Sequence, residues 1–304
     1  MPSAANYLGR AEYWTERVRS EGEGDEQGFD WLLPSDNAGF KSFITDAVKQ
    51  VSTQTTETPR VLHLGPGSSK LSLWMHDLVD KPHHVVHFDF AESAKELGER
   101  WERESWPDAG EQRMRWMTGD LLELSSVRGL TQSLEDAERS EGRGVPGPIL
   151  FDVLVDKGTL DAISCVEALA PQSELVECIK NYAPEIPAKV IKTPIYSSLM
   201  VALNLAAICR PGAAWVMLSY GGTRFDAFTA RVRSETPRSL EELASRLWRL
   251  EVRRELEEDV KTEDENGDVK RTKAYHWLYL LRRTDVPFGV EPLEKNQEKV
   301  AVNP

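Results

Sequence analysis

Two glycines and an aspartate are the residues whose types and spacing point most directly to chemistry. Gly65 and Gly67 follow the apolar run at 60–64, and Asp89 closes a second apolar run 24 residues after Gly65. Glycines let a ligand lie against the backbone, and a carboxylate at the end of the next strand can accept hydrogen bonds from both ribose hydroxyls. This spacing predicts a nucleoside site; a turn that merely closes a strand is the alternative.

The lack of two other motifs narrows the kind of nucleoside. Lys70 stands where dinucleotide sites have the third glycine of G-x-G-x-x-G, which disfavours a hydride-transfer cofactor. The sequence has no G-x-x-x-x-G-K-[ST] loop, so an ATPase or GTPase would lack its phosphate cradle and its magnesium ligand. Adenosine without a polyphosphate agrees better with these residues, and S-adenosylmethionine is its common form.

Four segments resemble those of a known family. Residues 151–162 (FDVLVDKGTLDA) closely resemble a strand-and-turn signature of one branch of the seven-strand, class I methyltransferases. That branch includes the translation elongation factor 1-alpha lysine methyltransferases. Residues 12–17 (EYWTER), 29–31 (FDW) and 275–280 (YHWLYL) look like the branch's N-terminal arm and closing strand. The matches run in the same order from about residue 10 to 283.

The resemblance implies a cofactor, S-adenosylmethionine, with S-adenosylhomocysteine as the product, and roles for individual residues. Arg17 would offer its guanidinium to the methionine carboxylate. Asp89 would bind the ribose hydroxyls, Phe90 would lie against the adenine, and Asp120 would bind the adenine amino group. The full cofactor set that the resemblance implies is Trp14, Arg17, Trp31, Gly65, Gly67, Ser68, Asp89, Phe90, Asp120, Leu121, Asp156, Lys157 and Gly158.

The glycine turn departs from the family pattern at two positions. Pro66 and Ser68 stand where the family usually has cysteine and asparagine, so one backbone N–H is missing and a hydroxyl replaces an amide. These departures leave open a protein that keeps the fold but has lost methyl transfer and acts as a scaffold.

Methyl transfer needs a nucleophile in line with the cofactor's methyl group, and a lysine nucleophile must first lose its proton. Asp156, Asp161 and Tyr220 are the candidate proton acceptors or positioning groups, and Asp156 and Tyr220 are the predicted catalytic residues. The expected activity is S-adenosylmethionine-dependent transfer to a lysine of a protein substrate such as an elongation factor. A small-molecule oxygen, nitrogen or sulfur acceptor is the runner-up.

The elements that position these residues alternate between strand and helix. The pattern predicts an α/β, doubly wound, Rossmann-like sheet of seven strands, mostly parallel with an antiparallel last strand, and helices on both faces. Expected strands are 60–64, 84–89, 113–118, 151–156, 214–219, 248–256 and 274–282, the last two forming a hairpin around Asn266-Gly267. Expected helices are 36–51, 69–79, 91–104, 196–209 and 238–247.

The domain organisation is predicted as one catalytic unit with two appendages. Residues 1–58 form a helical arm and cofactor lid, 59–284 the methyltransferase domain, and 285–304 a tail. Residues 125–148 are rich in glycine, serine and charge, which predicts an insertion between the third and fourth strands with a mobile end at 142–148; whether the insertion is ordered stays open.

Composition and charge disfavour several further classes of function. Fifty acidic against 37 basic residues give a net charge of −13, which disfavours nucleic-acid and membrane binding and favours a basic partner. Three cysteines without a CxxC pair disfavour a disulfide framework or a structural zinc site. Without a signal or membrane-spanning pattern, the expected location is the cytoplasm or nucleus.

Six histidines are expected to be structural, and no metal site is expected. His63 is expected to be a core imidazole that could also face the cofactor. His83, His84 and His87 are expected to alternate across a strand, which keeps them from sharing one metal ion.

Overall fold

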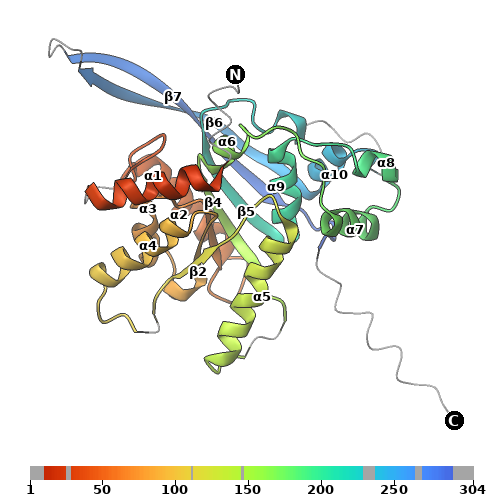
Figure 1. Cartoon of the computed structure of the whole chain (residues 1–304), viewed down its shortest axis with the longest axis horizontal. Helices are drawn as coiled ribbons and strands as arrows, with labels where there is room; N and C mark the ends of the chain where they lie inside the picture. Colours follow the sequence, from red (N-terminus) through yellow and green to blue (C-terminus); the bar gives the residue numbers. More distant parts are fainter. Residues whose placement is uncertain are drawn as a thin grey trace.

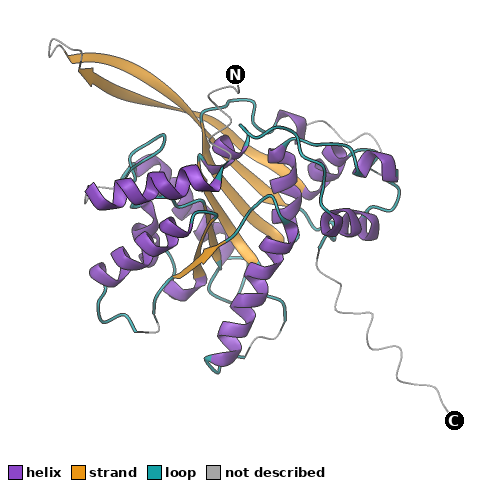
Figure 2. Ribbon diagram, viewed as in Figure 1, coloured by secondary structure: helices purple, strands orange, loops and turns teal. Residues whose placement is uncertain are grey.

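The computed structural model describes residues 10–24, 29–110, 112–144, 147–228, 237–263 and 269–289. One seven-stranded sheet runs through this part of the chain in the order β3-β2-β1-β4-β5-β7-β6 (Figure 2). Only β7 runs against its neighbours, so the predicted doubly wound sheet with an antiparallel last strand is confirmed. The strands are β1 (Val61–Leu64), β2 (Val85–Asp89), β3 (Arg115–Thr118), β4 (Phe151–Lys157), β5 (Cys209–Ser219), β6 (Trp248–Glu263) and β7 (Val269–Arg283).

The central strands are apolar on both faces because helices cover both. Every residue of β1, β2 and β4 is buried. Parallel strands covered on two sides read as continuous apolar runs, which is why they were recognisable in the sequence. Leu64 pairs with Phe88 on one side and with Asp156 on the other, so the carboxyl ends of β1, β2 and β4 lie at the same edge.

Side chains on the two faces of the sheet belong to two separate cores. On one face, Val61 and Val153 pack with α2, α3 and the β3 residue Trp116. On the other face, Leu62 and Leu154 pack with α5, α7, α9 and α10. Figure 1 shows the helices around the sheet, with the β6–β7 hairpin extending away from the body. The longer helices are α1 (Ala11–Gly24), α2 (Ala38–Ser52), α4 (Glu92–Ser105), α5 (Leu124–Ser140), α7 (Ser173–Tyr182), α9 (Ser197–Ala206) and α10 (Leu240–Leu247).

Most of the segment 125–148 is a helix that the sequence analysis did not assign. Leu124–Ser140 is a regular helix, α5, that crosses from β3 to β4. Val127, Leu130 and Leu134 recur at helical spacing and are buried in the core. The many charges between them lie mainly on the solvent side, and they hid this periodicity in the sequence.

Three further boundaries differ from the prediction. The helix expected over 69–79 is only α3 (Leu71–Trp74) followed by a 3₁₀ turn, Met75–Asp77, because the chain tightens before it turns back toward β2. The helix expected over 196–209 ends at Ala206, and β5 begins at Cys209 with an irregular pairing to β4 before Ala214. Both hairpin strands are longer than expected, and the Asn266-Gly267 loop lies outside the described residues.

The remaining pieces are short and follow the predicted breaks. Between β4 and α9 lie α6 (Thr159–Ile163), α7 and α8 (Ala188–Ile191). Two short 3₁₀ turns, Pro82–His84 and Asp226–Phe228, complete the helical segments described here. Within the described ranges, no helix combines the length and apolar character needed to cross a bilayer.

Substitution of two helical glycines, one on α4 and one on α5, should change the free energy of unfolding in opposite directions. A Cβ at Gly98 would overlap the Trp116 ring, so Gly98→Ala should lower the free energy of unfolding by about 1–3 kcal/mol. Gly129 lies on α5 with nothing near its missing Cβ, so Gly129→Ala should raise the free energy of unfolding by about 0.5–1 kcal/mol. Urea titration of both variants measures the difference, and equal effects would contradict this packing.

Candidate functional site

The glycine turn after β1 and the aspartate at the end of β2 are joined by a hydrogen bond. Gly65 and Gly67 have φ values of 57° and 52°, a backbone region that favours glycine. The Gly67 N–H donates to Asp89 Oδ2 at 2.9 Å, and the Ala91 N–H donates to Asp89 Oδ1 at 2.9 Å. Burial raises the pKa of Asp89, and these N–H donors oppose the rise by stabilising the carboxylate.

Gly65 is required by the turn after β4 as well as by its own backbone. A Cβ at Gly65 would overlap the Thr159 side chain. The Thr159 hydroxyl donates to Leu64 O at 2.7 Å, so the start of α6 is held against the end of β1. The two strand ends are thereby locked side by side beneath the predicted ligand.

The N-terminal arm is fastened over the strand ends by a largely buried ion pair. Lys157 Nζ lies 2.8 Å from Asp30 Oδ1, and the Lys157 side chain is only 4% exposed. Ser69 Oγ donates to the same Asp30 oxygen at 2.5 Å, and the Ser35 N–H donates to Asp30 Oδ2 at 2.6 Å. These contacts lower the pKa of Asp30, although burial acts in the other direction.

Two indoles of the arm form the upper wall of the site. The rings of Trp14 and Trp31 meet edge to face with centroids 5.8 Å apart. Trp31 packs on the turn after β4, where a Cβ on Gly158 would lie 2.6 Å from the indole Cδ1. The glycine of the DKG segment therefore makes room for an aromatic side chain from the arm as well as adopting a φ of 81°.

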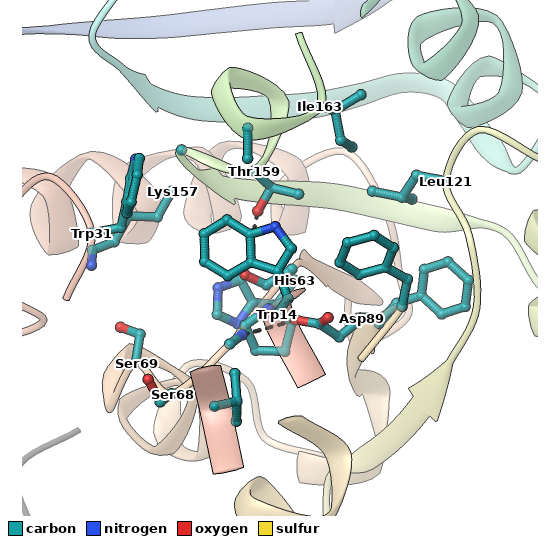
Figure 3. A pocket seen from close by; sticks show the side chains of 18 of the residues that line it. Trp14, Trp31, His63, Ser68, Ser69, Asp89, Leu121, Lys157, Thr159 and Ile163 are labelled. Atoms are coloured by element: carbon teal, nitrogen blue, oxygen red, sulfur yellow. Dashed lines mark hydrogen bonds between the residues drawn. The ribbon is translucent and has the colours of Figure 1, made fainter. Parts of the chain in front are cut away.

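A cavity opens between this wall and the strand ends (Figure 3). It holds about 1050 Å³ of space, including open solvent at its mouth. Eleven of the predicted site residues line it, and Figure 3 shows several of their side chains around the same space. The eleven are Trp14, Trp31, Gly65, Gly67, Ser68, Asp89, Phe90, Asp120, Leu121, Lys157 and Gly158.

Arg17 is not on the cavity wall, although it was expected to bind a carboxylate there. Its Nε lies 2.7 Å from Glu21 Oε1, and its guanidinium donates to the Tyr13 hydroxyl at 3.1 Å. It also lies over the Phe29 ring, 4.1 Å from the centroid. The residue one helical turn later, Glu21, lines the cavity instead.

Asp156 also lies outside the cavity lining. Its carboxylate is buried and accepts from the Thr159 N–H at 2.8 Å and from the Leu160 N–H at 3.3 Å, which caps α6. Burial raises the pKa of Asp156 to about 8, with a further rise from neighbouring Asp161. In this arrangement Asp156 shapes the turn that presents Lys157 and Thr159.

Tyr220 lies beside the cavity rather than in its wall. The Tyr220 ring is 6.4 Å from Trp31 and 5.4 Å from His276, and the residue is 55% exposed. Asp161 holds this loop: it accepts from Ser219 Oγ at 2.7 Å, from the Tyr220 N–H at 2.9 Å and from Arg224. The exposed Tyr220 ring thus lies between Trp31 of the cavity wall and the buried His276 ring.

At the far side, Asp120 and Leu121 occupy the loop after β3 as predicted. Asp120 Oδ1 accepts from the Leu122 N–H at 2.8 Å, and burial raises the pKa of Asp120. Phe88, in β2, and Phe90, just after it, also line the cavity. This end offers aromatic faces, a carboxylate and free loop backbone, which suit a flat heterocycle.

His63 is a core imidazole, and it also lines the cavity. It is 1% exposed, its Nδ1 lies 3.1 Å from His87 Nδ1, and burial lowers its pKa to about 3. A neutral ring at this point adds no charge to the cavity.

The other histidines do not alternate across a strand as expected. His83 and His84 lie in a buried 3₁₀ turn, and their ring nitrogens come within 4.8 Å of a Glu138 carboxylate oxygen. Glu138 already pairs with Arg60 at 3.4 Å and lies 3.9 Å from Arg143. Those two guanidiniums balance the carboxylate, and we assign no metal to this cluster.

Three polar residues of the site were not assigned from the sequence: Glu21, Asp30 and Thr159. Asp30 lies inside the FDW segment and Thr159 inside the DKGT segment, so both were within recognised motifs. Their partners come from distant parts of the chain, and only folding brings them together. Glu21 lies in an acidic run at 20–26 that the sequence alone does not distinguish from a solvated surface.

Several solved structures have a similar fold. A scan of protein-family models and a search of curated proteins gave no match. Among solved structures, the N-methyltransferase NodS from Bradyrhizobium japonicum WM9, in complex with S-adenosylhomocysteine, is 12% identical, with 89% of this chain and 98% of that chain covered and a TM-score of 0.41. A S-adenosylmethionine-dependent methyltransferase from Anabaena variabilis is 10% identical, with 90% and 94% covered and a TM-score of 0.46. Functional inference rests on the geometry of the cavity itself.

The buried carboxylate of Asp156 predicts a pH-dependent effect of substitution. Its pKa is about 8 in the folded protein against an ordinary value of 3.8. Its contribution to stability is therefore full below about pH 4 and is lost as the pH rises through about 8. Asp156→Asn keeps an oxygen acceptor without the charge, so the free energy of unfolding of this variant should gain on that of the wild type across this range.

Urea titrations at several pH values between 4 and 8 test this expectation. Asp36→Asn, at an exposed carboxylate, is the control and should leave the difference nearly constant. A pH-independent difference for Asp156→Asn would show that the carboxylate is charged in the fold.

Proposed function

We propose that the protein is a S-adenosylmethionine-dependent methyltransferase whose acceptor is a lysine of a protein substrate. The observation that carries the cofactor assignment is the turn in which Gly65 and Gly67 expose their backbone beside Asp89. Asp89 keeps lone pairs for two ribose hydroxyls because each oxygen has room for more than one donor. The cavity beyond it continues in both directions, toward Asp120 and toward Ser68.

The residues present are compatible with the whole cofactor. The cavity lining runs from Ser68 past Asp89 to Asp120, so polar groups are present along the length that a nucleoside and an attached amino-acid chain would occupy. Trp14 and Trp31 add apolar faces on the opposite wall. When bound, the cofactor supplies a methyl group on a positively charged sulfur, and the protein's task is to align an acceptor and exclude water.

Aromatic rings beside the cavity support lysine as the acceptor. The half-exposed Tyr220 ring contacts Trp31 of the cavity wall on one side and the buried His276 ring on the other. Aromatic faces attract a cationic side chain and enclose its methylenes. An exposed ring beside the cavity wall suits a side chain attached to a protein, whereas a small molecule would favour a closed chamber. The net charge of −13 favours a basic protein partner.

The proton of the lysine has no dedicated acceptor among the candidates. Asp156 is capped by backbone N–H groups and buried beneath the cavity, and Asp161 already accepts from three donors. Burial raises the pKa of Tyr220, which keeps its hydroxyl protonated. We therefore assign Asp161 and Tyr220 to positioning, and the lysine binds as a cation and gives its proton to water before methyl transfer.

Cofactor binding is tested by calorimetry with a matched pair of glycine variants. The wild type should bind S-adenosylmethionine and S-adenosylhomocysteine. Gly67 and Gly110 have φ values of 52° and 56°, and nothing lies near either missing Cβ. Alanine at either position should cost about 1 kcal/mol of stability, but only Gly67→Ala should abolish binding, because its methyl group enters the cavity. No binding by the wild type would favour the scaffold alternative.

The acceptor is tested by methyl transfer from labelled cofactor to basic peptides that contain lysine or have arginine in its place. Label should enter only the lysine peptides, and its rate should rise about tenfold per pH unit below the pKa of lysine near 10.4. Tyr220→Ala should slow transfer without weakening cofactor binding, whereas Tyr196→Ala, at an exposed tyrosine directly before α9, should leave transfer unchanged. Labelling of small molecules alone would overturn the lysine assignment.

A further inference from the structure

Glu21 is a carboxylate in the cavity that the proposed function leaves without a role. It lies on α1 and lines the cavity with Ser68. Glu21 Oε2 accepts from Ser68 Oγ at 2.6 Å, and Glu21 Oε1 lies 2.7 Å from Arg17 Nε. Its side chain is 21% exposed. The contact with Ser68 joins two parts of the chain 47 residues apart, so the fold itself places this carboxylate beside the glycine turn.

Glu21 lies beside Ser68, away from the end of the cavity that Asp120 and Leu121 line. The other cavity carboxylates among the described residues are Asp89, which accepts from the Gly67 and Ala91 N–H groups, and Asp120, which accepts from the Leu122 N–H. Lys157, the cation of the cavity wall, is paired with Asp30. The end beside Ser68 therefore presents one carboxylate, Glu21, with the Arg17 guanidinium directly behind it.

A pair of opposite charges is complementary to a zwitterion. The amino-acid end of the proposed cofactor carries an ammonium and a carboxylate on one carbon atom. We propose that Glu21 accepts hydrogen bonds from that ammonium and so determines specificity for a ligand with an intact α-amino group; this rests on the proposed function. Each oxygen of Glu21 has one donor in this structure, and a carboxylate offers about four acceptor positions, so room for the ammonium remains.

The rival role for Glu21 predicts a change of opposite sign. Glu21 could occupy the place of the ligand's own carboxylate between Arg17 and Ser68, and the ligand would then have to displace it. Neutralising Glu21 would strengthen binding in that case. Under our proposal the same change weakens binding, because a charge-assisted hydrogen bond is lost.

Calorimetry with two ligands separates these roles. S-adenosylhomocysteine has the amino-acid end, whereas methylthioadenosine has the same nucleoside and thioether without it. Glu21→Gln should weaken binding of S-adenosylhomocysteine about tenfold and leave that of methylthioadenosine unchanged. Glu16→Gln is the matched control, because Glu16 also pairs with an arginine of α1, Arg19, but faces solvent.

The ratio of the two affinities is the decisive readout, since it does not depend on the fraction of folded protein. Glu21→Asp, which keeps the charge, should preserve more of this ratio than Glu21→Gln. An unchanged or increased affinity of Glu21→Gln for S-adenosylhomocysteine would overturn the proposal, and so would an equal loss for both ligands. Failure of the wild type to bind either ligand would instead refute the proposed function.

Discussion

The ion pair between Asp30 and Lys157 is the interaction on which the cavity depends. It joins the N-terminal arm to the end of β4 and, together with the contacts of α1 to Ser68 and Ser93, holds Trp14 and Trp31 over the strand ends. A nearly buried ammonium is costly unless it is paired and hydrogen-bonded. Its partner Asp30 also accepts hydrogen bonds from Ser69 Oγ and the Ser35 N–H. The pair fixes one position of the arm, and that position encloses the cavity.

The cavity floor is built from backbone as much as from side chains. Gly65 and Gly67 bring main chain to the surface, while Thr159 and Asp156 tie the neighbouring turn to it. Carboxylates at this edge are buried, which raises their pKa values, and N–H donors rather than cations oppose that rise. Such a floor is rigid and nearly neutral, which suits a ligand whose binding depends on shape and a few directed hydrogen bonds.

Charge in the site is concentrated at the edges instead. Glu21 and Arg17 form one edge on α1, and Asp161 with Arg224 forms another beneath Tyr220. Under the proposed function, the first edge would meet the amino-acid end of the cofactor, and the second supports the loop that carries Tyr220. The two charged edges would then serve the two ligands separately.

The sequence by itself determined the order of strands and helices, the glycine turn, Asp89 and most of the cavity lining. These features depend on local patterns: apolar runs for buried parallel strands, glycines where φ is positive, and motifs in which neighbours in sequence stay neighbours in space. The same local reasoning missed α5, because surface charges masked its apolar stripe. Only the tertiary structure decided that Asp156 supports the floor, that Arg17 turns toward Glu21, and that Asp30 meets Lys157. Asp30 and Lys157 are 127 residues apart, whereas the Arg17–Glu21 and Asp156–Thr159 contacts are local. In each case packing between distant elements decides which partner the side chain meets, and no local pattern encodes that packing.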